Sequence, residues 1–396
     1  MAFIRRTLMR RDQELVDFEI APAESKARVV DASPEGDDLL ACLWPAEKSR
    51  DETIRKLVEA RTISSLREDK ENILAALGAK SSAELALKGH GSSLSDQFWY
   101  RAPDSTERWE DINFFENEWD TDFGEAVMSG DYARLASCSP DVPDVTTPGH
   151  ASKTWERNDD GIFLVKAANK PDGADLMGAK LASEMCALLF GEGGGVPLDI
   201  VERYGRPCST SPLMLAADEE LANGHRILDM AGMRNNRFEG NLDAETCNTR
   251  IKAYEAIGVA GASAHVAKMA CCSCLTLLAD FHEGNFGAIR KVGSDAWRPA
   301  PIFDYDGSFG FPFKERQIPE LCANPTLTML LCAQMFSYLE PSWDWSWYDP
   351  QALVGFEERF VEAYAPYRSL PSNFGELVAF LFAMQRDNVD RIASGE

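Results

Sequence analysis

The stretch DFHEGNFGAIR, residues 280–290, interrupts a mostly helical half of the chain and has no helical pattern of its own. It places a carboxylate and an amide five positions apart, at Asp280 and Asn285, and continues into a short apolar run that is typical of a β-strand. A second interruption, PAPIFDYDGSFG, again ends a short apolar run on an aspartate, Asp304. The elements around these two segments decide the fold class.

Ahead of the helical half, the chain has mainly strand patterns. Residues 161–168 (GIFLVKAA) are typical of a strand, and a helix predicted to start near residue 177 ends at the glycines of GEGGGVP, residues 191–197. Residues 196–205 and 206–215 then predict two strands joined by a Tyr-Gly turn. Strands with one helix, followed by a helical half, predict an α+β chain of two lobes with a cleft between them.

The first part of the chain has patterns of its own. Residues 14–32 alternate apolar and polar side chains on both sides of a Pro-containing turn, which predicts a hairpin. Two helices are expected after it, one from Asp51 and one that ends at Gly78. Because these residues lack the side-chain types of a catalytic site, we interpret residues 1–90 as an accessory or docking module. Residues 137–149, SCSPDVPDVTTPG, are turn-rich and are expected to be exposed.

Composition excludes several classes of function. The 396 residues include 64 acidic and 40 basic side chains, for a formal net charge of −24. Such a chain repels a phosphate backbone, so direct binding of nucleic acid is not expected. The most apolar stretch, Val266 to Ala279, is too short to span a bilayer, so no membrane insertion is expected.

The ten cysteines are scattered and accompany no apolar secretory segment at the N-terminus, which predicts reduced thiols and a cytoplasmic location. Three of them, Cys271, Cys272 and Cys274, lie close together in an apolar helical pattern. We interpret these three as core residues in preference to a metal or redox site, because no second pair has the spacing of a zinc site.

Asp280 and Asn285 have the spacing of the catalytic loop of protein kinases. In that loop the aspartate accepts the proton of the substrate hydroxyl and the asparagine binds a metal ion. Asp304 follows Asp280 by 24 residues (304 minus 280) and ends an apolar run, where a second metal ligand is expected. Asp306 is the alternative for this role. The segments together predict a site for phosphoryl transfer.

Two further parts of such a site precede this region. Lys166 ends the strand GIFLVK, where its charge is costly unless it meets phosphates or a carboxylate. Glu184 lies among apolar residues of the next helix, so we predict a Lys166–Glu184 ion pair. The segment TTPGHASK, residues 146–153, is a candidate phosphate-binding loop with a single glycine. The alternatives are a lysine that reaches solvent and an exposed polar loop.

The order and spacing of these motifs resemble the HipA family of bacterial serine/threonine kinases, especially longer HipA-domain proteins with an extra N-terminal segment. TTPGHASK is similar to the family's S-x-x-G-x-x-x-K phosphate loop, GIFLVK to its ATP-lysine strand, and SEMCALL to the helix usually written N-E-x-x-x-x-x-L. DFHEGNFG is similar to D-x-H-x-x-N-F, and PAPIFD to the A-P-x-[YF]-D metal site. The likeness runs from about Ser92 to Gly310.

The resemblance implies a two-lobed, protein-kinase-like fold with a small N-terminal accessory module (1–90), a strand-rich N-lobe (91–217) and a helical C-lobe (218–396). It implies that Asp280 is the catalytic base and that Asn285 and Asp304 bind Mg²⁺. The residues that it implies contact ATP are Thr146, Gly149, His150, Ala151, Ser152, Lys153, Lys166, Glu184, Met214, Leu215 and His282.

The resemblance also has departures. The conventional H-R-D is absent, because His282 follows the aspartate, and Ser183 stands where the family often has asparagine. Thr146 occupies the place where the family's loop is autophosphorylated on serine, so we expect Thr146 or Ser152 to accept phosphate. The acidic composition disfavours a complex bound directly to DNA.

The resemblance therefore implies an ATP- and magnesium-dependent protein kinase that restrains growth, with an unidentified protein substrate and an antitoxin or other regulator as partner. Two alternatives stay open. One is a kinase-fold phosphotransferase that acts on a lipid or small molecule, and the other is a nucleotide-binding scaffold without catalysis.

Overall fold

The computed structural model describes residues 3–43, 49–65, 67, 69–233, 243–278, 280–309, 317–335 and 338–395. Contacts between residues divide the chain into two compact units. The first unit comprises residues 1–167, 215–221 and 290–295, and the second comprises residues 168–214, 222–289 and 296–396. The predicted module boundaries at residues 90 and 217 stay a prediction. Ala279 and Gly310, which close two of the segments analysed above, lie outside the described residues.

A four-stranded antiparallel sheet begins the first unit. Its order is β3-β2-β1-β4, with β1 at Ile4–Arg10, β2 at Gln13–Ala21, β3 at Lys26–Ala32 and β4 at Phe98–Arg101. The predicted hairpin over residues 14–32 is confirmed, because β2 and β3 pair from Ala21↔Lys26 to Val16↔Ala32. The alternating apolar residues of β2 face the core, where Val16, Phe18 and Ile20 are buried.

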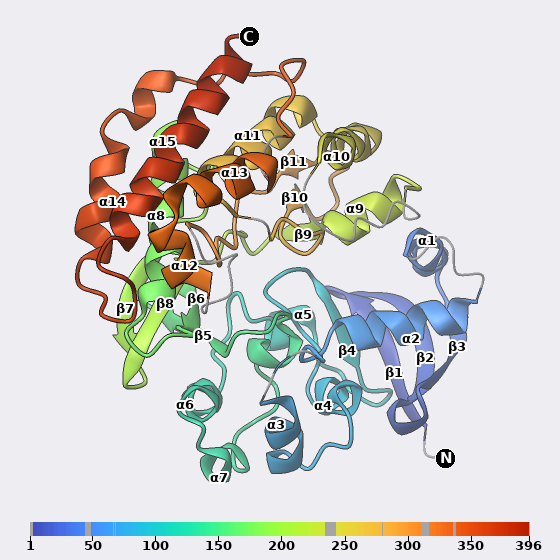
Figure 1. Cartoon of the computed structure of the whole chain (residues 1–396). Coiled ribbons are helices and arrows are strands. Elements are labelled where there is room, and N and C mark those ends of the chain that lie inside the picture. The colour runs from blue at the N-terminus through green and yellow to red at the C-terminus, as the bar shows by residue number, and fades with distance from the viewer. Residues whose placement is uncertain are drawn as a thin grey trace. The chain divides into compact units, whose positions relative to one another are not determined.

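The helices of the first unit are short. They are α1 (Pro34–Cys42), α2 (Arg50–Ala60), α3 (Lys70–Ala76), α4 (Ser82–Lys88), α5 (Trp109–Ile112), α6 (Thr121–Ser129) and α7 (Tyr132–Leu135), with 3-10 turns η1 (Pro22–Glu24) and η2 (Pro143–Thr146). Both predicted helices are confirmed as α2 and α3. Ser49 caps α2 by accepting a hydrogen bond from the Glu52 amide. In Figure 1, α2 lies against the β1–β4 sheet.

The expectation that residues 137–149 are exposed is wrong for residues 142–146. Residues 142–146 are buried around the turn η2. Val142 and Val145 belong to an apolar cluster with Phe123 and Leu135 of helices α6 and α7. Val142 and Val145 bury one face of this turn, which begins at Pro143. The sequence did not indicate this burial, because the composition of the segment is typical of exposed turns.

The next two strands form a second hairpin, β5 (Lys153–Asn158) and β6 (Gly161–Ala167). The strand predicted from GIFLVKAA is therefore confirmed as β6. The hairpin register pairs Asn158 with Gly161 at the turn and Lys153 with Lys166 at the other end.

The helices of the second unit are α8 (Ala174–Phe190), α9 (Gly224–Met230), α10 (Ala244–Ala256), α11 (Ala262–Thr276), α12 (Ile318–Ala323), α13 (Pro325–Met335), α14 (Phe356–Tyr364) and α15 (Phe374–Ala393), with a 3-10 turn η4 (Pro350–Leu353). Its strands β7 (Asp199–Arg203) and β8 (Arg206–Pro212) form an antiparallel hairpin. Strands β9 (Glu219–Asn223) and β10 (Gly287–Lys291) contribute residues to both units, and β11 (Arg298–Pro299) pairs with β10.

The core of the second unit is built on α8, α11 and α15. Cys271, Cys272 and Cys274 lie on α11 and are completely buried, and all ten cysteines are free. The interpretation of this segment as a core helix is thus confirmed. Trp343 and Trp345 of the segment WDWSWYD, residues 343–349, are also buried. In Figure 1, α14 and α15 run side by side.

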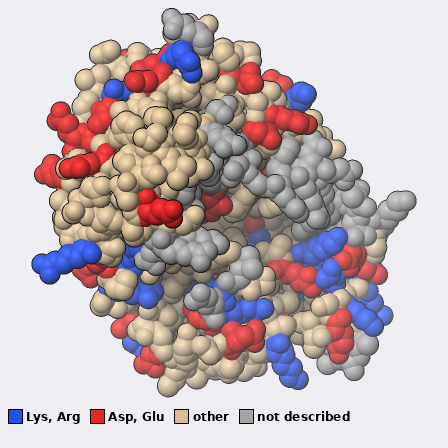
Figure 2. Space-filling model, viewed as in Figure 1, with Lys and Arg blue, Asp and Glu red and all other residues tan. Residues whose placement is uncertain are grey.

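Basic side chains of the first unit are largely balanced by acids. Arg5, Arg28 and Arg101 form ion pairs with Asp17, Glu19 and Glu14. Figure 2 shows Lys and Arg side chains in small groups beside Asp and Glu. Within the described ranges, no helix is long and apolar enough to cross a membrane.

One carboxylate of the first unit is fully buried between two arginines. Glu220 of β9 has no exposed surface, and its Oε1 accepts from Nη2 of Arg10 at 2.8 Å and from Nε of Arg290 at 2.7 Å. Removing one partner of a buried ion pair leaves an uncompensated buried charge, which costs more than an exposed pair contributes.

We expect Glu220→Gln to lower the free energy of unfolding by about 3–5 kcal/mol, because Arg10 and Arg290 then face one another without a carboxylate. Urea denaturation followed by circular dichroism measures this. Glu14→Gln, which removes an exposed partner of Arg101, serves as the control and should cost less than about 1 kcal/mol. Equal losses in the two variants would contradict the role given to Glu220.

Candidate functional site

The candidate phosphate loop, residues 146–153, lies between η2 and β5 in the first unit. Gly149 has a φ of +110°, and a Cβ atom at this position would lie 2.2 Å from Nζ of Lys153. The Lys153 ammonium donates to the carbonyl of Pro148 at 2.6 Å. The loop therefore needs its glycine for the backbone conformation, while the Lys153 side chain lies close to it.

Two lysines face one another at the end of the β5–β6 hairpin. Lys153 and Lys166 are directly opposite in the antiparallel register. Lys153 is buried and Lys166 is half-buried. Two lysines directly opposite in a sheet concentrate positive charge at this end of the hairpin. The structure thus brings together three of the predicted ATP-contacting residues, Gly149, Lys153 and Lys166.

Thr146 begins this loop and is held in place by its hydroxyl. The side chain is 6% exposed, and Oγ1 donates to the carbonyl of Ser92 at 2.7 Å and to that of Pro143 at 3.2 Å. Phosphorylation of Thr146 therefore requires η2 to open. Ser152 is more accessible, because it is half-buried and its hydroxyl contacts only Sδ of Met128, at 3.5 Å, among the contacts described.

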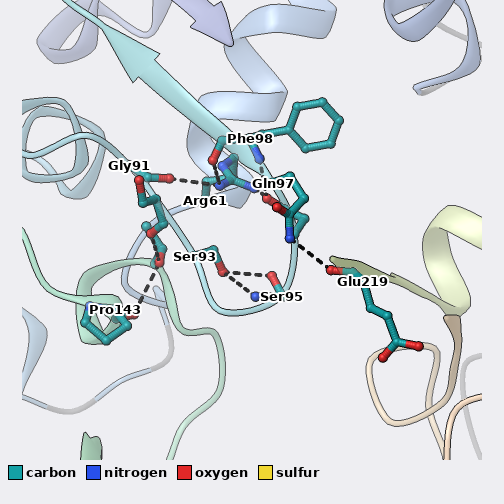
Figure 3. A network of polar contacts seen from close by, with 11 residues as sticks. Arg61, Gly91, Ser93, Ser95, Gln97, Phe98, Pro143 and Glu219 are labelled. Atoms are coloured by element: carbon teal, nitrogen blue, oxygen red, sulfur yellow. Dashed lines mark hydrogen bonds and ion pairs between the residues drawn. The ribbon is translucent and has the colours of Figure 1, made fainter. Parts of the chain in front are cut away.

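The segment that holds Thr146, residues 91–98, is itself anchored by a buried arginine. Arg61, at the end of α2, donates to the carbonyls of Gly91 and Phe98 at 2.8 Å each and pairs with Asp96. Figure 3 shows Arg61 between Gly91 and Phe98, and Gln97 pointing toward Glu219. Gln97 Nε2 donates to the carbonyls of Ala217 and Glu219 at 3.0 and 3.1 Å. Sequence patterns missed Arg61, because its partners lie more than one element away.

A buried carboxylic acid lies two residues before Thr146. Burial raises the pKa of Asp144 to about 6, although a hydrogen bond with Thr154 and the charge of Arg67 lower it. Asp144 is 3% exposed, and its Oδ1 has no hydrogen-bond partner in the part of the chain described. The turn that leads into the phosphate loop therefore contains a carboxyl group whose charge is costly.

The candidate catalytic loop, residues 280–287, lies in the second unit. The side-chain amide of Asn285 donates to the backbone carbonyl of Asp280 at 2.8 Å, and its backbone amide donates to His282 at 2.9 Å. The Asp280 carboxylate is exposed, with His282 Nε2 at 3.7 Å. The structure therefore brings together Asp280, His282 and Asn285, and their predicted roles stay a prediction.

Asp304 lies in a segment that runs beside this loop. The Ala300 amide donates to the carbonyl of Gly287 at 2.9 Å, and Pro301 and Ile302 line a small hollow together with Asn285. Asp304 itself has a φ of +61°, in the left-handed region. Such a conformation is uncommon for a residue with a side chain, although aspartate adopts it more readily than most, and strained residues are enriched at functional sites.

The remaining residues of the predicted ATP site are Glu184, Met214, Leu215, His150 and Ala151. Glu184 is half-buried on α8 and pairs with Arg359, with Lys180 at 3.9 Å, so its charge does not depend on Lys166. The predicted Lys166–Glu184 pair stays a prediction. Met214 ends a segment of the second unit and Leu215 begins one of the first. His150 is exposed, and Ala151 is half-buried in the phosphate loop.

A helix that sequence analysis did not connect with the site supports the candidate catalytic loop. Arg250 and Tyr254 of α10 donate to the carbonyls of Phe281 and Gly287, the latter at 2.9 Å. Gly224, at the start of α9, leaves room for the loop, because a Cβ atom there would lie 2.3 Å from the Phe286 ring. No local signal marks these residues, since their contacts span 31 positions or more.

The donor chemistry of Asp280, Asn285 and Asp304 fits magnesium, which prefers carboxylate and amide oxygens to nitrogen or sulfur. The Asn285 amide nitrogen is already engaged with the Asp280 carbonyl, which fixes which end of the amide remains available. Within the described ranges, this site included, no group of three or more His, Cys, Asp or Glu side chains is arranged to hold a metal ion.

Comparisons with known proteins identify the fold. No family model and no curated protein sequence matches the chain. Among solved structures, HipA of a Shewanella oneidensis MR-1 toxin–antitoxin system, in a complex with HipB and its operator DNA, has a TM-score of 0.52 and 10% identity, covering 99% of this chain and 100% of that chain. The proinflammatory kinase CtkA of Helicobacter pylori has a TM-score of 0.46 and 11% identity, covering 62% of this chain and 90% of that chain.

The resemblance to HipA that the motifs carry is thus confirmed at the level of the fold. The chain has an α+β, protein-kinase-like fold that extends over nearly its whole length.

The raised pKa of Asp144 predicts how stability depends on pH. Between about pH 4 and 6 the Asp144 carboxyl is protonated more fully in the folded chain than in the unfolded chain. The contribution of Asp144 to the free energy of unfolding therefore falls as pH rises, and the full loss, on the order of 3 kcal/mol, is reached above pH 6. We expect Asp144→Asn to raise the melting temperature more at pH 7.5 than at pH 5, as measured by calorimetry.

Val145→Ala is the control for a change in the same turn. It removes buried apolar volume and should lower the melting temperature equally at both pH values. An effect of Asp144→Asn that is independent of pH would contradict the assignment.

Proposed function

We propose that this chain is a HipA-like serine/threonine protein kinase that transfers the γ-phosphate of ATP to a protein hydroxyl. The arrangement of Asp280 and Asn285 carries the proposal. An exposed carboxylate projects from a loop whose backbone is fixed by the amide of Asn285, five residues on. This is the arrangement that a kinase needs for a base and a metal ligand. The kinase-like fold supports it.

Each group has a role in this proposal. Asp280 accepts the proton of the attacking hydroxyl while that oxygen bonds to the γ-phosphorus and the bond to the β-phosphate oxygen breaks, releasing ADP. Lys166 and Lys153 bind phosphate oxygens, and the loop around Gly149 covers them. Met214 and Leu215 contact the adenine ring.

Asn285 and Asp304 are the proposed ligands of Mg²⁺, which neutralises charge on the phosphates when it is bound. The left-handed backbone at Asp304 and the Asn285–Asp280 hydrogen bond both limit the freedom of these ligands. Ligands that are fixed in advance lose less entropy on binding.

We further propose that the activity restrains growth and that a regulator or antitoxin binds this chain. The HipA structure with HipB supports this only by similarity of fold. We propose no direct contact with nucleic acid, in keeping with the net charge of −24 and the ion-paired arginines of the first unit.

We expect Asp280→Ala to lower kcat for phosphate transfer by on the order of 100-fold or more, with the affinity for ATP nearly unchanged. The purified chain is incubated with labelled ATP, magnesium and a cell lysate, and the phosphorylated residues are mapped. The side chain is exposed, so the melting temperature should not change.

Asp295→Ala, which removes another exposed aspartate, is the control and should retain full activity. Transfer that survives Asp280→Ala would disprove the role of this residue. Label found only in a lipid extract would instead favour a lipid acceptor. Label on Thr146 would show that η2 opens, because this hydroxyl is buried.

A further inference from the structure

One face of α10 is directed at the candidate catalytic loop. Arg250 is 3% exposed, and its Nη2 donates to the carbonyl of Phe281, the residue that follows Asp280. The same guanidinium lies over the ring of Phe286, 4.4 Å from its centroid, and Phe286 follows Asn285. One side chain thus contacts the immediate neighbours of both the proposed base and the proposed metal ligand.

Tyr254, one turn further along α10, holds the end of the same loop. It is fully buried, its hydroxyl donates to the carbonyl of Gly287 at 2.9 Å, and its ring lies 6.0 Å from that of Phe286. Residues four apart share one face of a helix, so Arg250 and Tyr254 form a rigid pair. Their two acceptor carbonyls, on Phe281 and Gly287, bracket the loop.

The loop also contains a buried acid whose charge attracts that of Arg250. Glu283 is 9% exposed, and its Oε1 has no hydrogen-bond partner among the described residues, nor has Nε of Arg250. The charges of Glu283 and Arg250 attract one another. A buried carboxylate is costly without an opposite charge, so Arg250 also stabilises the loop electrostatically.

We propose that Arg250 is a positioning residue that sets the separation of Asp280 and Asn285, because its guanidinium contacts both Phe281 and Phe286. This inference rests on the proposed function for its catalytic consequence, because only a kinase reaction requires that separation. The guanidinium suits this task better than an ammonium group. It lies over the Phe286 ring while Nη2 donates to a carbonyl, whereas lysine is a flexible point charge.

A purely structural arginine would give some of the same contacts, so the test separates loop position from stability. Arg250→Met alone leaves Glu283 uncompensated and is expected to destabilise the fold. The double variant Arg250→Met/Glu283→Gln removes both charges and is compared with Glu283→Gln alone. Arg386→Met on α15 is the matched control, because Arg386 also pairs with a carboxylate, Glu357, and donates to a carbonyl.

The first readout is amide hydrogen exchange of loop residues 280–287 in the free protein. We expect exchange in the double variant to be at least tenfold faster than in Glu283→Gln, with no change in Arg386→Met. The second readout is kinetic. We expect kcat to fall at least tenfold and the Mg²⁺ concentration for half-maximal rate to rise at least fivefold, with KM for ATP within threefold. Arg250→Lys should recover stability but only part of kcat.

The two readouts fail in different ways. Hydrogen exchange is measured without ATP, metal or acceptor, so it tests whether Arg250 holds the loop even if the wild type transfers no phosphate. An absence of transfer by the wild type would contradict the proposed function alone. Loop exchange in the double variant equal to that in Glu283→Gln overturns the positioning role. Full activity in Arg250→Lys would also overturn the positioning role, because a positive charge alone would then be sufficient.

Discussion

The hydrogen bond from the Asn285 amide to the Asp280 carbonyl is the contact on which the second unit's candidate site depends. It closes a short loop between α11 and β10, and it leaves the Asp280 carboxylate exposed while its backbone is fixed. Phe281 and Phe286 of this loop are buried in the core of the second unit, and helix α10 holds the loop's backbone through Arg250 and Tyr254. The backbone carbonyls of Phe281 and Gly287 therefore connect this loop to two buried side chains of α10.

In the first unit, the phosphate loop is also held by hydrogen bonds to neighbouring segments. This loop follows a buried 3-10 turn, and that turn is fixed by one hydroxyl, that of Thr146, bound to the carbonyl of Ser92. The segment around Ser92 is in turn held by the guanidinium of Arg61. In each unit, a buried arginine donates to a backbone carbonyl outside the regular elements, Arg61 to that of Gly91 and Arg250 to that of Phe281.

The sequence predicted the elements whose signals are local. The hairpin around residue 24 and the strand that carries Lys166 were visible in alternation and in apolar runs. The Asp280–Asn285 pair was visible as spacing, and the structure joins the two residues. Burial of residues 142–146 was not predictable, because their turn-forming composition resembles that of exposed loops. The roles of Arg250 and Arg61 depend on partners from distant segments, which no local pattern encodes.

The accessory role predicted for the first 90 residues must be compatible with how deeply they are built into the first unit. Arg10 of β1 pairs with Glu220, a carboxylate with no exposed surface, and Arg61 anchors the segment that holds Thr146. The Arg61 guanidinium is buried and the Glu220 carboxylate has no exposed surface, so neither group is available to a partner. Any docking by this part must use its exposed surface, while its interior fixes the backbone around the phosphate loop. Removing these residues would therefore leave Glu220 with one arginine and the Thr146 turn without its anchor, which makes them part of the first unit's folding core.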